Sequence, residues 1–169
     1  FCFKFIYFFI KKNNIYLNYL FCNSSSLKKI SSYDTSLKSK KLPRITKYNK
    51  KYLSYVDIIF TALPNGEAQL ISKDLLKKNT LIDLAADFRL NKASDYLKWY
   101  KQKHKALSNI KNSIYALPEI TGKLVKKFSI IGCPGCYPTS ILLPLIPLVK
   151  KRSINLKNII IDSKSGYSG

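Results

Sequence analysis

The feature that most constrains the fold is a regular alternation, from Val56 onward, of short apolar runs with segments of helical periodicity. Apolar runs of strand length without polar alternation are typical of parallel sheets that are covered on both faces. Strands that alternate with helices indicate βαβ units. We therefore predict an α/β fold with a parallel sheet and helices on both faces. The predicted strands are Val56–Leu63, Thr80–Leu84, Phe128–Gly132 and Lys157–Asp162, and the predicted helices are Glu67–Asn79, Ser94–Lys103 and Pro138–Val149.

The first 51 residues carry a weaker pattern, which predicts a buried helix over Phe1–Ile10, a strand over Ile15–Cys22 and a loop over residues 23–51. Phe1–Ile10 is followed by charge and by no small-residue cleavage site, which argues against a secretory signal. The chain has no apolar run of about 18 residues, so we expect no membrane-spanning helix. Because the sequence contains no Met, we expect an incomplete chain.

The chain is strongly basic, with 30 Lys and Arg residues, 9 Asp and Glu residues and a net charge of +21. Such a balance favours anionic partners. However, Arg44, Arg89 and Arg152 are the only arginines, and nucleic-acid recognition favours the arginine fork. The lysines are also spread along the chain together with many Asn, Ile, Tyr and Phe residues, as a coding bias would produce. We therefore expect no nucleic-acid partner, while anionic small molecules remain suitable ligands.

The four cysteines are Cys2, Cys22, Cys133 and Cys136, and their spacing does not resemble a secreted disulfide framework. This usage favours a reducing, cytoplasmic compartment. Cys133 and Cys136 have the spacing of a redox dithiol or of half a zinc site. A zinc site would need further ligands that the sequence does not offer at a useful spacing, so we predict no metal.

Residues suited to chemistry follow the predicted strands. Pro64–Gly66 follows one strand, Asp87–Arg89 the next, and Pro134–Cys136 a third. In parallel α/β sheets, ligands bind beyond the carboxyl ends of the strands. Cys136 also precedes a predicted helix, where unpaired N–H groups and the helix dipole stabilise a thiolate. From local chemistry alone, a nucleophile and a small buried apolar residue are equally good interpretations of Cys136.

Six ordered motifs lie within about two-thirds of the chain. They are residues 62–66 (ALPNG), 82–90 (IDLAADFRL), 99–100 (WY), 115–119 (YALPE), 134–139 (PGCYPT) and 164–169 (KSGYSG). Together they resemble the N-acetyl-γ-glutamyl-phosphate reductases, which belong to the semialdehyde dehydrogenases. This resemblance implies a truncated Rossmann-type domain over residues 1–132, without its glycine loop, and the beginning of an α/β catalytic and dimerisation domain over residues 133–169.

The resemblance also implies the chemistry. The Cys136 thiolate attacks an acyl phosphate and forms a thioester, which NADPH reduces to an aldehyde in arginine biosynthesis. Arg89 matches an arginine that holds an anionic substrate group, as a guanidinium fork can. A structural pairing is its alternative role. The resemblance assigns Ser165 and Gly166 to substrate, and Pro64, Asn65, Gly66, Pro138 and Ser168 to the cofactor. It implies a homo-oligomer for the full-length protein.

Four features depart from the family pattern or qualify it. No glycine-rich dinucleotide loop is present, since the first glycine is Gly66. Cys133 replaces the family's Asn, which would permit a disulfide with Cys136. Ser24 stands near the place of the arginine expected to meet the NADP 2′-phosphate, so NADP and NAD both remain open. His104, the single histidine, lies between two lysines, and we predict that it is a solvated surface residue.

We therefore predict an NADP-dependent acyl-phosphate reductase whose isolated 169-residue chain is inactive. Three alternatives remain. The first is a related enzyme that acts on aspartyl or aminoadipyl phosphate. The second is a non-catalytic relic of such a reductase. The third is a basic nucleic-acid-binding module.

Overall fold

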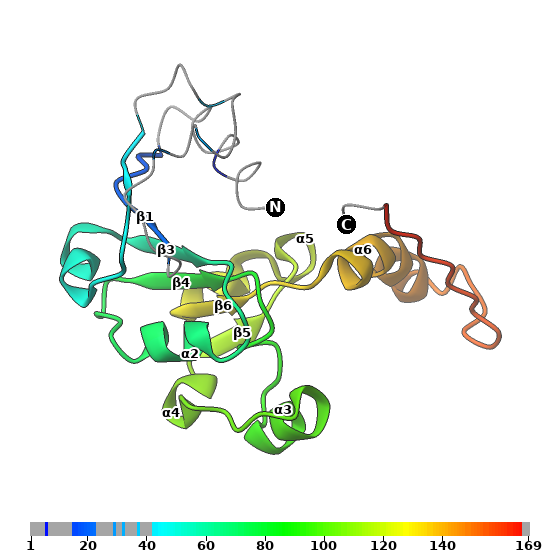
Figure 1. The fold of residues 1–169 in the computed structure, drawn as a ribbon. Helices are drawn as coiled ribbons and strands as arrows, with labels where there is room; N and C mark the ends of the chain where they lie inside the picture. The colour runs from blue at the N-terminus through cyan, green and yellow to red at the C-terminus, as the bar shows by residue number, and fades with distance from the viewer. Residues whose placement is uncertain are drawn as a thin grey trace. The chain divides into compact units, whose positions relative to one another are not determined.

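The computed structural model describes residues 6, 15–22, 29, 32, 37 and 42–166. The chain divides into two compact units, Phe1–Asp57 and Ile58–Gly169 (Figure 1). The first unit pairs β1 (Leu20–Phe21) with β2 (Ile45–Thr46) in parallel, and a 3-10 helix η3 (Lys50–Tyr55) follows. Its buried side chains Ile6 and Leu37 pack with partly buried leucines and Ile45.

The second unit is built on a four-stranded sheet. Its strands are β3 (Ile58–Thr61), β4 (Thr80–Asp83), β5 (Ser113–Tyr115) and β6 (Ile130–Gly132), in the order β3-β4-β6-β5, and every neighbouring pair is parallel. The helices are α2 (Glu67–Ser72), α3 (Ala93–Tyr100), α4 (Leu107–Ile110), α5 (Pro118–Thr121), η4 (Gly122–Lys127) and α6 (Cys136–Lys150). This parallel sheet with its helices confirms the predicted Rossmann-like α/β class.

The register of the sheet places four strand ends side by side. Thr61 pairs with Asp83, Asp83 with Gly132, and Gly132 with Tyr115. Because all four strands are parallel, the segments that follow them leave from one edge. The connections that carry Gly66, Arg89 and Cys136 therefore begin at the same edge of the sheet, as the sequence predicted.

The core of this unit lies between α2 and the sheet. Ala68 of α2, Leu81 of β4, Ile130 of β6 and Phe88 are all buried, and Ile59 packs against them. On the opposite face, Ile58 and Phe60 of β3 keep 55% and 37% of their surface exposed. Burial is thus deepest on the face that α2 covers, which is also the helix that follows the β3 turn.

Three predictions of secondary structure were wrong. The helix predicted over Glu67–Asn79 ends at Ser72, and the chain then turns, with the Asn79 side chain accepting a hydrogen bond from the Leu76 N–H. Lys157–Asp162 is not a strand, because no described strand pairs with it, and Ile160 is 91% exposed. Within the predicted loop 23–51, the described residues include β2.

Other differences are smaller. β5 was not predicted, although Ser113–Tyr115 carries a β-branched and an aromatic residue. The strand predicted over Ile15–Cys22 is present as Leu20–Phe21, and of the helix predicted over Phe1–Ile10 only Ile6 lies within the described residues. Among the described residues, no helix is long and apolar enough to cross a membrane.

Candidate functional site

The turn after β3 is held in one conformation by its glycine. Gly66 is buried, has a φ of 94° in the left-handed region, and precedes the first residue of α2. Its N–H donates to Asp87 Oδ1 at 2.7 Å. Pro64 and Asn65 are exposed beside it. The turn therefore exposes Pro64 and Asn65, while its backbone is held by the hydrogen bond from Gly66 to Asp87.

Asp87 is a fully buried carboxylate that provides this anchor. Besides Gly66, it accepts hydrogen bonds from the Gln69 backbone N–H at 3.2 Å, the Gln69 side chain at 3.0 Å and the Tyr96 hydroxyl at 2.7 Å. Burial and the bond to Asp87 raise the pKa of Tyr96, so this hydroxyl keeps its proton and donates. A carboxylate at the first turn of a helix satisfies N–H groups that lack intrahelical partners.

Asp83, the last residue of β4, organises the same loop from the other side. Its carboxylate accepts from the Thr61 hydroxyl at 2.8 Å and from the backbone N–H groups of Ala85 and Asp87, both at 3.2 Å. Burial raises the pKa of Asp83, and these hydrogen bonds oppose that shift. The segment from Asp83 to Arg89 is consequently a rigid connection between β4 and its neighbours.

Arg89 joins the ends of β4 and β6. Its Nε donates to the Cys133 carbonyl oxygen at 2.8 Å, and its Nη2 donates to the Leu84 carbonyl oxygen at 3.1 Å. A Cβ atom on Gly135 would lie 3.7 Å from Nη1, so the guanidinium lies against the turn that leads to Cys136. The structural role that the sequence left open is therefore present, and Nη1 makes no hydrogen bond to the described residues.

Cys136 is the first residue of α6 and is exposed. Gly135 precedes the helix, and its carbonyl oxygen accepts from both the backbone N–H and the hydroxyl of Thr139. Cys133 is partly buried, and burial raises the pKa of its thiol. Both thiols are free, so the disulfide that the sequence would permit is not formed. An accessible thiol at a helix start is suited to nucleophilic attack.

The prediction for His104 was wrong, because this residue is only 7% exposed. The Ala106 N–H donates to His104 Nδ1 at 3.2 Å, so Nε2 carries the proton and donates to the Asp87 carbonyl oxygen at 3.0 Å. Burial lowers the pKa of His104, and the bond to Asp87 opposes the shift. The ring also makes edge contacts with Phe88 and Tyr96. Flanking lysines thus gave no guide to the burial of the residue between them.

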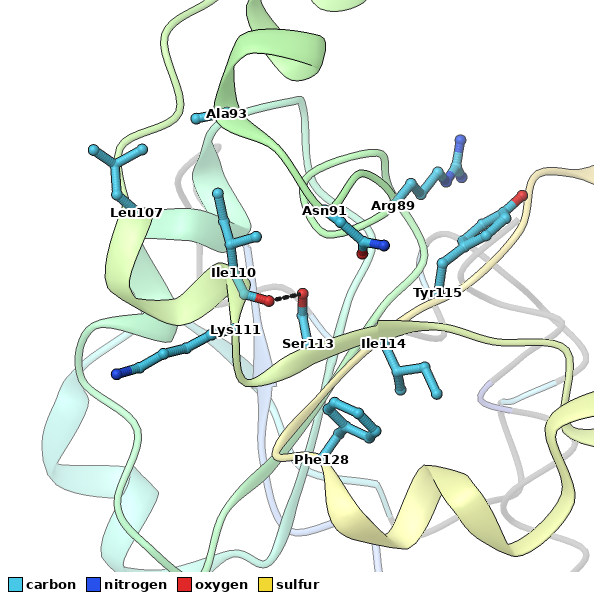
Figure 2. Close-up of a pocket in the computed structure, with 10 residues that line it drawn as sticks. All are labelled: Arg89, Asn91, Ala93, Leu107, Ile110, Lys111, Ser113, Ile114, Tyr115 and Phe128. Atoms are coloured by element: carbon cyan, nitrogen blue, oxygen red, sulfur yellow. Dashed lines mark hydrogen bonds between the residues drawn. The ribbon is translucent and has the colours of Figure 1, made fainter.

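A groove of about 820 Å³ runs along β5. Figure 2 shows the Arg89 guanidinium and the Tyr115 ring at one end of this groove, and Lys111 at the other. Burial raises the pKa of Tyr115, and the positive charge of Arg89 opposes that shift. The sequence identified YALPE only as a motif, and Tyr115 was not singled out.

The remaining predicted residues are less tightly placed. Pro138 is exposed in the first turn of α6. Ser165 and Gly166 are exposed, and within residues 42–166 no hydrogen bond joins them to Cys136 or Arg89. Ser168 lies outside the described residues. No cluster of three or more His, Cys, Asp or Glu residues suited to a metal is found in the described part of the chain.

Comparison with known protein families decides the affiliation. Residues 6–128 match the NAD-binding domain of semialdehyde dehydrogenases, and residues 136–169 match the dimerisation domain of the same group. The chain belongs to the semialdehyde dehydrogenase family. The first match ends near β6, and the second begins at Cys136. The described site therefore includes the junction between the two matched regions.

The chain is similar to curated relatives from plants and bacteria. It is 45% identical over 133 residues to the "Probable N-acetyl-gamma-glutamyl-phosphate reductase, chloroplastic" of Arabidopsis thaliana, covering 79% of this chain and 33% of that protein. It is 46% identical over 120 residues to the N-acetyl-gamma-glutamyl-phosphate reductase of Desulforamulus reducens, covering 70% and 35%. It is 41% identical over 163 residues to the N-acetyl-gamma-glutamyl-phosphate reductase of Thermoanaerobacter pseudethanolicus, an alignment that covers 94% of this chain and 46% of that protein. This semialdehyde dehydrogenase chain thus spans a third to less than half of these relatives.

Proposed function

We propose that the protein carrying this sequence reduces N-acetyl-γ-glutamyl phosphate to N-acetylglutamate semialdehyde, with NADPH, in arginine biosynthesis. The observation that carries the proposal is the exposed Cys136 thiol at the start of α6, on a turn that the Arg89 guanidinium holds in place. The names of the relatives support the choice of substrate.

The first step is acyl transfer to Cys136. The sulfur lone pair of the thiolate attacks the acyl carbon, a C–S bond forms, and the bond between that carbon and the phosphate oxygen breaks. Phosphate leaves with the electron pair of that bond. Arg89 Nη1 lies on the Gly135 side of the guanidinium, so it can hold an anionic group of the substrate. A thioester accepts hydride more readily than an ester or an amide would.

When bound, NADPH supplies the hydride that converts the thioester to the aldehyde and releases the thiolate. Pro64 and Asn65 are exposed on the turn anchored at Gly66, and Pro138 is exposed on α6, so all three would be accessible to a bound cofactor. We assign these residues and Ser168 to the cofactor, and Ser165 and Gly166 to substrate. The choice of NADP over NAD, and the division of domains after residue 132, are parts of the same proposal.

The assembly and the location are proposals as well. The match of residues 136–169 to a dimerisation domain supports a homo-oligomer of the full-length protein. A thiol nucleophile requires a reducing compartment, and we propose the cytoplasm, although two relatives are named as chloroplastic. The ligands we propose are a small acyl phosphate and a dinucleotide, without a nucleic-acid or membrane partner. We propose further that the 169 residues alone do not turn over, since their sequence has no glycine-rich loop.

Turnover by the full-length gene product tests the substrate assignment. NADPH oxidation is measured with N-acetyl-γ-glutamyl phosphate, and in parallel with aspartyl phosphate and aminoadipyl phosphate, each against the Cys136→Ser variant. We expect the first substrate to give the highest kcat/KM and the variant to lose about 10³-fold or more. Preference for either other acyl phosphate would assign the protein to a related reductase. Absence of turnover with all three would identify a relic.

A further inference from the structure

The buried side chains of Asp83 and Asp87 accept hydrogen bonds from different parts of the chain. Both side chains are fully buried, and both lie in the segment that follows or ends β4. Among the described residues, Asp83 accepts from Thr61, the last residue of β3, and from Ala85 and Asp87 of its own loop. Asp87 instead reaches across to the β3 turn, through Gly66 and Gln69. Asp83 therefore ties its loop to the end of β3, whereas Asp87 ties the loop to the turn and helix that follow β3.

The bonds of Asp87 leave the β3 turn little freedom. The Gly66 N–H donates to Asp87 Oδ1 over an N···O distance of 2.7 Å. Gln69 of α2 donates to the same carboxyl group through both its backbone N–H and its side-chain amide. The Gln69 side-chain oxygen in turn accepts from the Lys105 N–H at 2.6 Å. Charge-assisted bonds of this kind are stronger than neutral ones. The turn and the start of α2 are thus fixed to the β4 loop by a charged group.

We propose that Asp87 is a positioning residue that fixes the Pro64–Gly66 turn relative to the Arg89 and Cys136 side of the site. The cofactor-contacting role of that turn rests on the proposed function, whereas its anchoring does not. Asp87 and Arg89 lie two residues apart, so one short segment holds both the β3 turn and, through the Cys133 carbonyl, the thiol turn. When substrate and cofactor are bound, this segment would therefore set how the β3 turn and Cys136 lie relative to one another.

The same contacts bear on how the turn could meet a dinucleotide. The N–H groups of Gly66 and Gln69, which a phosphate could otherwise use, already donate to the Asp87 side chain. If the cofactor of the proposed function binds beside this turn, these two N–H groups would not hold its phosphates.

The anchoring is tested first on the unaltered 169-residue chain by NMR. A scalar coupling across the hydrogen bond between the Gly66 amide nitrogen and the Asp87 carboxyl carbon is expected. Its absence overturns the proposal. This measurement needs neither a variant nor a ligand, so it holds even if a substitution at Asp87 prevents folding.

Two matched variants then separate positioning from general stability. Asp87→Asn is expected to raise amide hydrogen exchange at Gly66 and Gln69 by about 10-fold or more, because an amide group cannot accept all of these bonds. Asp83→Asn changes an equally buried carboxyl group that makes no hydrogen bond to Gly66 or Gln69, so exchange at Gly66 should rise less than in Asp87→Asn. The pH profile of Cys136 alkylation by iodoacetamide should be the same in Asp87→Asn as in the wild type.

Equal exchange at Gly66 in the two variants would overturn the proposal, because burial alone would then explain it. A change of the Cys136 profile in parallel with the exchange would also overturn it, because Asp87 would then act on the whole fold. If the proposed reductase function fails, these three readouts keep their expected values. The two ideas can therefore fail separately.

Discussion

At the scale of single residues, the two neighbouring cysteines have different environments. Cys136 is exposed at the start of α6, while Cys133 is partly buried and burial raises the pKa of its thiol. Because the thiolate is the reactive form, burial and the raised pKa both make Cys133 the less reactive thiol. The interpretation of Cys136 as a small buried residue, which was equally good from local sequence alone, does not agree with its exposure.

The reactivities of the two thiols can be compared directly. At neutral pH we expect iodoacetamide to modify Cys136 about 10-fold or more faster than Cys133. Peptide mass spectrometry after short reaction times measures both rates in one sample. Cys133→Ser should leave the rate at Cys136 unchanged. Equal rates at the two thiols would count against the nucleophile assignment.

His104 predicts a pH dependence of stability. Its pKa is lowered in the folded chain by burial, so the folded state binds fewer protons than the unfolded state as pH falls below the ordinary value near 6.5. Stability from this group is therefore present above about pH 6.5 and is lost on acidification. We expect the free energy of unfolding to fall more between about pH 8 and pH 5.5 in the wild type than in His104→Gln.

Urea unfolding at the two pH values measures this difference. The raised pKa of Asp83 has the opposite effect on stability in the acid range. This effect of Asp83 is present in both the wild type and His104→Gln, so it cancels when their free energies of unfolding are compared. The same pH dependence in wild type and His104→Gln would show that His104 is not buried in its neutral form.

At the scale of elements, the close approach of β6 to the β4 loop depends on Gly132. A Cβ atom there would lie 2.4 Å from the Phe88 carbonyl oxygen, a backbone atom that the hydrogen bonds of the loop hold in place. We expect Gly132→Ala to lower the free energy of unfolding by about 1–3 kcal/mol or more, measured by urea unfolding. Gly135→Ala is the matched control, because its Cβ would meet its neighbours at 3.6 Å or more. An equally small cost at both glycines would contradict this packing.

Elements were predictable from sequence where packing and pattern agree. β3, β4 and β6 are apolar runs whose inner face is buried or half-buried, although Ile58 and Phe60 of β3 are exposed, and their positions and parallel class followed from the apolar pattern. Helix α2 ends at Ser72, although apolar periodicity continues to Leu76, because local turns and the Asn79 side chain replace helical bonds. The isoleucines of 159–161 have strand propensity, but a strand needs a partner, and none is described for them.

The sequence predicted the site residues that follow the strands, but not the buried hydrogen bonds that hold them. Cys136, Arg89 and Gly66 follow strands, and parallel topology brings those connections to one edge. The hydrogen bonds of Asp83, Asp87 and Tyr96 depend on exact tertiary distances, which no spacing in the sequence encodes. The Asp residues at 83 and 87 could have been noted as acidic residues in an apolar stretch, since buried charges are bonded or paired.

At the scale of the whole molecule, the charge of +21 attracts anionic ligands. We expect the rate at which an anionic acyl phosphate modifies Cys136 to fall several-fold between about 0.02 M and 0.5 M salt, because the Debye length shortens from about 20 Å to below 5 Å. The rate with neutral iodoacetamide should change little over the same range. Equal salt dependence for both reagents would show that long-range charge has no part in substrate capture.

The central claim is that Cys136 is a nucleophile toward acyl phosphates, held in place beside Arg89. The most direct test is intact-mass analysis of the 169-residue chain after incubation with N-acetyl-γ-glutamyl phosphate, together with a measurement of phosphate release. We predict a single hydroxylamine-sensitive acyl adduct on Cys136, absent in Cys136→Ser and formed about 10-fold more slowly in Arg89→Lys. Adducts formed equally on Cys133 and Cys136, or no adduct on either, would contradict the account.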